Sequence, residues 1–256
     1  MKTYKSLIVL SVILVAAVIV SGCQAAAAPV KPVARQVEFE MVSHVTAEMP
    51  EQDVFVVKPA EADNVYRIQA TEAADFMAAP VYAASQTVEH DPFVLGDNPF
   101  GPYPKGVNLG FTMEEWLAST GHGTYTVKGD EAELDLAFEK LVPDGVYTVW
   151  CATMYLPPHV KVIDEPCGAA DGSANTFVAN PQGKAEFHLP MSALPDSTDE
   201  VIKIIAIAYH SDGKTYGPLP GDFGLNSHVQ LFFGLPSIES EAWQIVGSDG
   251  EIAHAH

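Results

Sequence analysis

The chain has 256 residues, 48% of them hydrophobic, and its 33 acidic side chains outnumber 13 basic ones, which gives a formal net charge of −20. Such a surface repels the phosphate backbone of nucleic acids, and the sequence contains no basic cluster, so nucleic-acid binding is excluded. The negative charge favours solubility and attracts cations or basic partners wherever carboxylates gather.

The first 23 residues have the pattern of an export signal. Two lysines precede an apolar stretch over residues 7–20, and Ser21-Gly22 leads directly into Cys23. This stretch lies within the range of about 7–15 residues found in signal peptides, whereas a membrane-spanning helix needs roughly 18 or more. We therefore expect cleavage, and an uncleaved membrane anchor is the alternative.

The run Val20-Ser21-Gly22-Cys23 resembles the lipobox of bacterial lipoproteins. The resemblance implies that residues 1–22 are removed as a lipoprotein signal peptide and that acyl chains such as palmitate are attached at Cys23. Two or three chains, at about 0.8 kcal/mol per buried methylene, give an anchor that hardly dissociates. The expected location is extracytoplasmic, on the cell membrane or outer membrane of a bacterium. Removal of two lysines leaves 13 − 2 = 11 basic against 33 acidic side chains, a net charge of −22.

Two cysteines, Cys151 and Cys167, remain after lipidation. In an exported chain such a pair normally forms a disulfide, which here closes a loop of about 16 residues and contributes about 3 kcal/mol. A zinc site using both thiolates is the alternative, although zinc-binding cysteines are usually closer in sequence.

Residues 23–90 contain several prolines and no sustained hydrophobic period. This composition predicts a flexible, partly disordered tether that lifts a domain away from the membrane. Short β-like fragments occur between residues 37 and 68, so one or two edge strands of the following domain could come from this region.

Residues 91–236 are predicted to form that domain. The sequence Thr112-Met113-Glu114-Glu115 matches a capping box and predicts a short helix that ends near Ser119. Alternating apolar residues between turn residues then predict seven strands, at 123–128, 133–141, 146–155, 175–179, 184–189, 200–210 and 228–233. The pattern fits an all-β fold, an antiparallel immunoglobulin-like β-sandwich. Residues 237–256 are predicted to be an acidic C-terminal tail.

Three histidines fall at one end of this sandwich if successive strands run antiparallel: His122, His210 and His228. Three imidazoles, with Asp212 beside them, suit copper or zinc. The alternative is that the histidines are unrelated, since a single missed strand reverses the count.

The segment between His210 and His228 has 17 residues, which is longer than a turn requires. Its chemistry suits a small ligand or a glycan, because two aromatic rings stand among hydrogen-bond acceptors. The candidate ligand-binding residues are Asp212, Tyr216, Asp222, Phe223 and Asn226. Alternatively, the two rings close the open end of the sandwich.

A second loop, residues 156–174, carries Asp164, Glu165 and Asp171. Their oxygens could hold calcium, but the spacing does not match an EF-hand loop. Solvated acids are the favoured interpretation.

Motifs of the common hydrolases and nucleotide enzymes, such as G-x-S-x-G, H-E-x-x-H and the phosphate-binding loop, do not occur. The sequence therefore favours a lipid-anchored extracytoplasmic binding or structural surface protein that meets a small ligand, glycan or protein partner at its loop end. A copper- or zinc-binding protein for metal handling or redox work is the alternative. A hydrolase of unknown type comes third.

Overall fold

The computed structural model describes residues 33–246 and 252–253. The chain divides into residues 1–31 and 32–256, and the description below concerns the second unit. The predicted signal peptide and Cys23 lie outside the described residues. No helix in the described ranges is long and apolar enough to cross a membrane.

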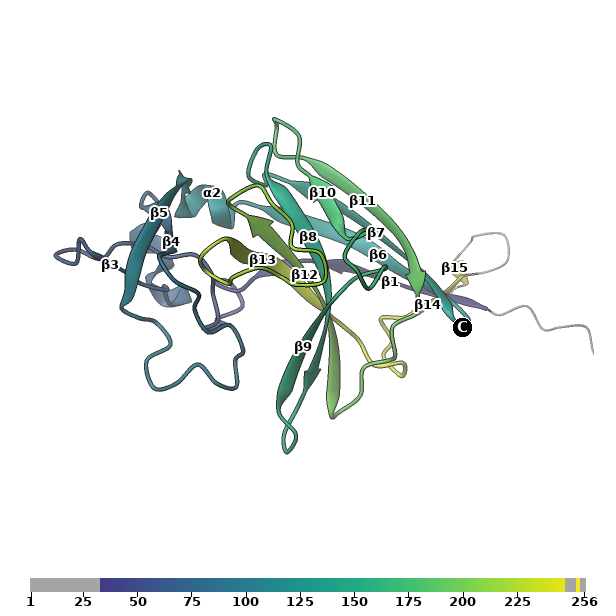
Figure 1. Ribbon diagram of the computed structural model, residues 1–256. Coiled ribbons are helices and arrows are strands. Elements are labelled where there is room, and N and C mark those ends of the chain that lie inside the picture. The colour runs from purple at the N-terminus through teal and green to yellow at the C-terminus, as the bar shows by residue number, and fades with distance from the viewer. Residues whose placement is uncertain (1–32, 247–251, 254–256) are drawn as a thin grey trace, which may run out of the picture. The chain divides into compact units, whose positions relative to one another are not determined.

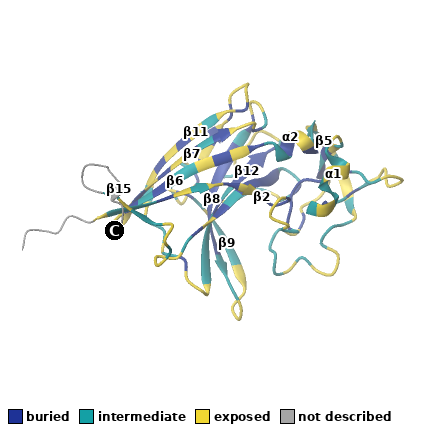
Figure 2. Cartoon of the chain, turned by 180° about the vertical axis from the view of Figure 1, so that it is seen from behind, coloured by how far each residue is buried: buried dark blue, intermediate teal, exposed yellow. Residues whose placement is uncertain are grey.

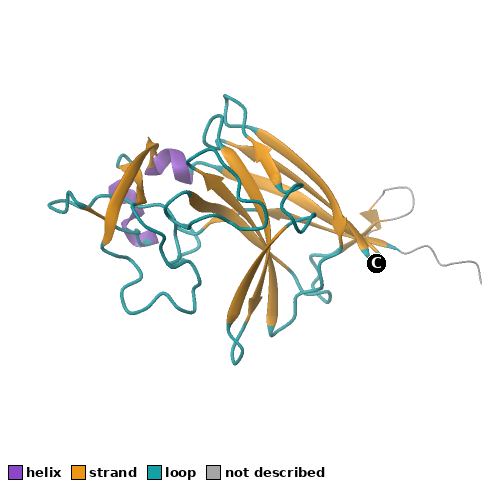
Figure 3. Ribbon diagram, in the orientation of Figure 1, coloured by secondary structure: helices purple, strands orange, loops and turns teal. Residues whose placement is uncertain are grey.

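Most strands of the described chain belong to two antiparallel sheets (Figures 1 and 3). Sheet A contains, in spatial order, β11 (Ala185–Ser192), β7 (Glu131–Glu139), β6 (Thr120–Lys128), β1 (Ala34–Glu40), β14 (Gln244–Val246) and β15 (Ile252–Ala253). Sheet B contains β10 (Thr176–Val178), β8 (Val146–Tyr155), β12 (Val201–His210), β13 (Ser227–Leu235) and β2 (Val42–Ser43), and β9 (Lys161–Pro166) pairs with β8.

A third, small sheet lies beside the helices (Figure 3). It contains β3 (Asn64–Val65), β5 (Tyr103–Thr112) and β4 (Pro80–Ala84). The helical segments are η1 (Ala70–Glu72), α1 (Ala73–Phe76) and α2 (Met113–Leu117).

Sheets A and B pack face to face around one hydrophobic core, so the predicted β-sandwich is confirmed. Strand β7 shows the alternation that produces this core, because Leu134, Leu136 and Phe138 are buried whereas Glu133 is exposed. Aromatic rings join the two layers, as where Phe39 of β1 stacks on Phe233 of β13 at a centroid separation of 3.4 Å. Buried strands of both sheets are dark blue in Figure 2.

The seven predicted strands correspond to β6, β7, β8, β10, β11, β12 and β13. The predicted helix is α2, and the Thr112 hydroxyl accepts a hydrogen bond from the Glu115 N–H while the Glu115 carboxylate accepts one from the Thr112 N–H. The predicted disulfide is also present, with the Cα atoms of Cys151 and Cys167 4.9 Å apart.

The ordered domain begins well before residue 91, which differs from the predicted tether over residues 23–90. Strand β1 lies inside sheet A, between β6 and β14, and Phe55 and Val56 are fully buried. The predicted C-terminal tail also contributes to this sheet, since β14 pairs with β1. The β-like fragment that begins at residue 37 overlaps β1, but its partners lie far away in the chain, so local patterns do not show that it lies inside the sheet.

Candidate functional site

Part of the chain between β2 and β5 packs on the outer face of sheet B. Side chains on this face form a small apolar cluster of their own, with Trp150, Ala208 and Val229 buried. The backbone N–H of Val229 donates to the Asp53 carboxylate at 3.0 Å, and the His228 ring contacts the Asp53 carbonyl oxygen at 2.7 Å. We call residues 44–102 the covering segment, because these contacts hold it against the sheet.

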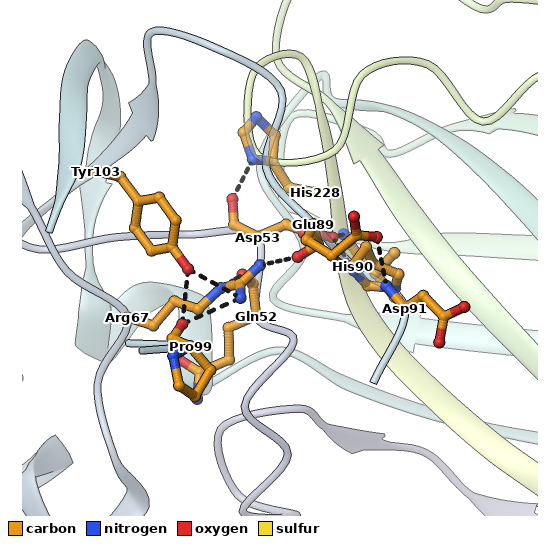
Figure 4. A network of polar contacts seen from close by, with 10 residues as sticks. Gln52, Asp53, Arg67, Glu89, His90, Asp91, Pro99, Tyr103 and His228 are labelled. Atoms are coloured by element: carbon orange, nitrogen blue, oxygen red, sulfur yellow. Dashed lines mark hydrogen bonds and ion pairs between the residues drawn. The ribbon is translucent and has the colours of Figure 1, made fainter. Parts of the chain in front are cut away.

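A buried polar network fixes the covering segment (Figure 4). Asp53 is fully buried, and its carboxylate pairs with Nδ1 of His90 at 3.0 Å. Arg67 is also fully buried and donates to the carbonyl oxygens of Gln52, Pro99 and Glu89, the last at 2.6 Å. Asp53 and Arg67 therefore each have an ionic or hydrogen-bonding partner, as burial of a charge in a low-dielectric interior requires.

A cavity of about 50 Å³ lies between the covering segment and sheet B. Four polar side chains line it, His44, Glu51, His90 and Asp164, and we call it the His–acid pocket. The rest of the lining is apolar: Met49, Pro92, Ala152, Met154, Val162, Ile204, Ala206, Val229 and Phe232. One water needs roughly 10–15 Å³ of such space, so the pocket has room for an ion or a few water-sized groups.

Two polar atoms at this pocket are buried without a hydrogen-bond partner, Nδ1 of His44 and Oε2 of Glu51. Their residues are 6% and 2% exposed. An unpaired buried polar atom costs about 1–3 kcal/mol, and native structures contain few of them. A species bound in the pocket would give both atoms a partner.

The electrostatics of the pocket separate its groups into charged and neutral ones. Burial raises the pKa of the Glu51 and Asp164 carboxyls. Burial, together with the neighbouring His90, lowers the pKa of His44 to about 3, so this imidazole stays neutral. Burial opposes the charges of Asp53 and His90 as well, but their mutual attraction outweighs it, raising the pKa of His90 and lowering the pKa of Asp53.

The three histidines predicted to share a metal do not all come together, although His210 and His228 lie near each other on the paired strands β12 and β13. His122 is exposed on β6 of sheet A, whereas His210 and His228 belong to sheet B and are buried there. The His210 Nε2 atom contacts Thr148 at 2.7 Å, and the His228 Nε2 atom contacts Ser211 at 2.9 Å. The strand count behind the prediction left out β9, and it took no account of the division into two sheets.

Among the described residues, no group of three or more His, Cys, Asp or Glu side chains is arranged to hold a metal ion. The copper or zinc site predicted from His122, His210 and His228 is therefore not formed.

Most polar side chains of the predicted ligand-binding loop are used within the loop. The Tyr216 hydroxyl donates to Asp212 at 2.5 Å, and the Asn226 side-chain oxygen accepts from the Asp222 N–H at 2.8 Å. The Asp222 carboxylate accepts from Thr87 of the covering segment at 3.0 Å. These bonds fix the shape of the loop.

Phe223 is the member of the predicted set that contacts a residue of the pocket. Its ring stacks on His90, with centroids 4.2 Å apart and an angle of 14° between the planes. The neighbouring backbone also bonds to the covering segment, since the Val88 N–H donates to the Phe223 carbonyl oxygen at 3.0 Å. The long loop thus holds His90 in place through both ring stacking and a backbone bond nearby.

Sequence reasoning missed His44, Glu51, Asp53 and His90 as site residues because they lie in the predicted tether. One signal was present: Asp53 directly precedes the apolar run Val54–Val57, and a charge that is buried beside such a run must be paired. Asp164 was interpreted as a solvated acid, yet it lies on β9 and lines the pocket.

Comparison with protein-family models, curated proteins and solved structures finds no match to this chain. Function is therefore inferred below from the chemistry of the site.

Proposed function

We propose that this protein is a lipid-anchored extracytoplasmic binding protein and that its binding site is the His–acid pocket. The observation that carries the proposal is the pair of buried polar atoms, on His44 and Glu51, that have no partner. Both belong to residues that line one cavity, so a single small ligand can satisfy both. The lipobox resemblance at Cys23 supports the anchor, and a disulfide supports an oxidising compartment.

A hydrolase is less well supported by the same residues. The Asp53–His90 pair resembles the half of a catalytic triad that orients and charges the histidine. A nucleophile would have to stand beside this histidine, but the residues that line the pocket include no Ser, Thr or Cys. Binding therefore accounts for the site better than nucleophilic catalysis does.

Native mass spectrometry and elemental analysis of the protein purified from membranes test the binding role. We expect the wild-type chain to carry a bound ion or small molecule, and the His44→Leu/Glu51→Leu variant to lack it. The matched control is Glu186→Leu/His188→Leu, which changes the same residue types in the groove on sheet A. Equal masses bound by all three proteins, or by none, would contradict the proposal.

The anchor is tested separately with Cys23→Ser, which removes the sulfur required for lipid transfer. We expect the variant to remain an uncut precursor or to leave the membrane fraction. A variant that is processed and sediments with membranes as the wild type does would contradict the anchor.

A further inference from the structure

The His–acid pocket brings together two kinds of metal-binding donor, imidazole and thioether. His44 and His90 line it from the covering segment, and so does Met49, while Met154 comes from β8 of sheet B. Met49 and Met154 are both partly buried. A thioether coordinates hard ions poorly but is a good ligand for soft ions, above all Cu(I).

The separation of the two imidazoles suits a shared ion. Their ring centroids are 5.5 Å apart and the planes are inclined by 53°. Imidazole nitrogens bind metals at about 2.0–2.1 Å, and each nitrogen lies about 1.2 Å from its ring centre, so a ring centre lies about 3.2 Å from a bound ion. The centres of two rings that share an ion are therefore at most about 6.4 Å apart. The observed separation is below this limit, so one ion can contact both rings.

The hydrogen bonds of the two rings leave nitrogen atoms free for a metal. Asp53 contacts Nδ1 of His90 and keeps a proton on that nitrogen, so an ion bound at Nε2 would replace the second proton of this ring. Metal-binding histidines are typically held by a carboxylate in this way. On His44, Nδ1 is buried and has no hydrogen-bond partner.

Burial in the pocket selects for low ionic charge. The desolvation free energy of an ion in a low-dielectric interior grows with the square of its charge, so it is about four times larger for a divalent ion than for a monovalent one. Zinc or calcium would need at least three nitrogen or oxygen donors, and the described residues contain no such group of His, Cys, Asp and Glu.

From this arrangement we propose that the His–acid pocket binds one Cu(I) ion through the imidazoles of His44 and His90 and the thioether of Met49 or Met154. The inference rests on the proposed function, because it names the ligand of the same pocket. The carboxyl groups of Glu51 and Asp164 also line the cavity, and the Asp53 carboxylate, which contacts His90, supplies the compensating negative charge. Copper enters and leaves as Cu(I), so the binding step involves no change of oxidation state.

The test is a competition titration of the full-length chain, purified in detergent, against a coloured Cu(I) chelator with ascorbate present and oxygen absent. We expect one Cu(I) per chain. The variants are His44→Leu and the double change Met49→Leu/Met154→Leu, each expected to weaken Cu(I) binding at least about 100-fold, since even the outer-shell partners of metal ligands contribute 10–100-fold. The control Met77→Leu/Met191→Leu alters two partly buried methionines outside the pocket and should bind as the wild type does.

Two results would overturn the proposal. One is the absence of stoichiometric Cu(I) binding, or Cu(I) binding that both pocket variants retain. The other is equally tight Zn(II) binding that survives the methionine changes and is lost in Glu51→Gln, which would make the pocket a nitrogen–oxygen site. A protein that binds no Cu(I) yet carries another species in native mass spectra would refute copper and leave the binding function standing.

Discussion

Replacing Asp53 with alanine should be among the most damaging single changes in the protein. The carboxylate is fully buried, accepts a hydrogen bond from the Val229 N–H and pairs with His90. Removing one partner of a buried ion pair costs about 3–5 kcal/mol, because the remaining charge stays buried and uncompensated. With a urea dependence of about 2–3 kcal/mol/M, the unfolding midpoint should fall by about 1–2.5 M.

The assay is urea unfolding followed by tryptophan fluorescence, since Trp150 is buried on the same face of sheet B. Asp53→Asn should cost less, because an amide oxygen can still accept from the Val229 N–H. Asp135→Ala is the matched control: it breaks another Asp–His pair, with His188, whose side chains are 53% and 59% exposed, so the midpoint should not move. A midpoint for Asp53→Ala within about 0.3 M of the wild type would refute the argument that this network holds the covering segment.

Three further predictions concern the rest of the fold. Changing Cys151 and Cys167 together to alanine should lower the free energy of unfolding by about 3 kcal/mol, and two thiols open to alkylation in the unfolded, unreduced chain would contradict the disulfide. Burial lowers the pKa of His210 to about 4, so the unfolded chain takes up a proton first as the pH falls from 6.5 to 4. The free energy of unfolding should therefore fall across this window by up to about 1.4 kcal/mol per pH unit. The fall should be less steep in His210→Gln, and equal slopes in the wild type and the variant would refute this prediction. Gly172→Ala should destabilise the protein by about 1–2 kcal/mol, because Gly172 has φ of +74° and a Cβ would lie 2.0 Å from the Gly217 oxygen, whereas an unchanged urea midpoint would contradict this close approach of the two loops.

The predictable part of the fold is the part specified by local patterns. Alternation identifies β7 and turn residues delimit its neighbours, while the capping box at Thr112 marks α2. Local patterns indicate a β-like fragment in the region of β1 but not its place inside the sheet, because its partners β6 and β14 come much later in the chain. A short fragment without nearby partners resembles a tether until the whole sheet is assembled.

The site was hidden from sequence reasoning for a related reason. Its polar residues come from two distant regions, His44 to His90 in the covering segment and Asp164 on β9, and no fixed spacing connects them. The histidines that the sequence did single out on sheet B, His210 and His228, are buried there and hydrogen-bond within the protein. Counting strand ends cannot say which face of which sheet a histidine occupies.

The copper X-ray absorption spectrum of the Cu(I)-loaded full-length chain shows directly which atoms surround the ion. We expect imidazole nitrogen neighbours together with sulfur scattering. The Met49→Leu/Met154→Leu change should remove the sulfur contribution, while Met77→Leu/Met191→Leu should retain it. A wild-type spectrum with nitrogen and oxygen neighbours alone, or sulfur scattering that persists after both pocket methionines are replaced, would contradict the assignment of the His–acid pocket as the Cu(I) site.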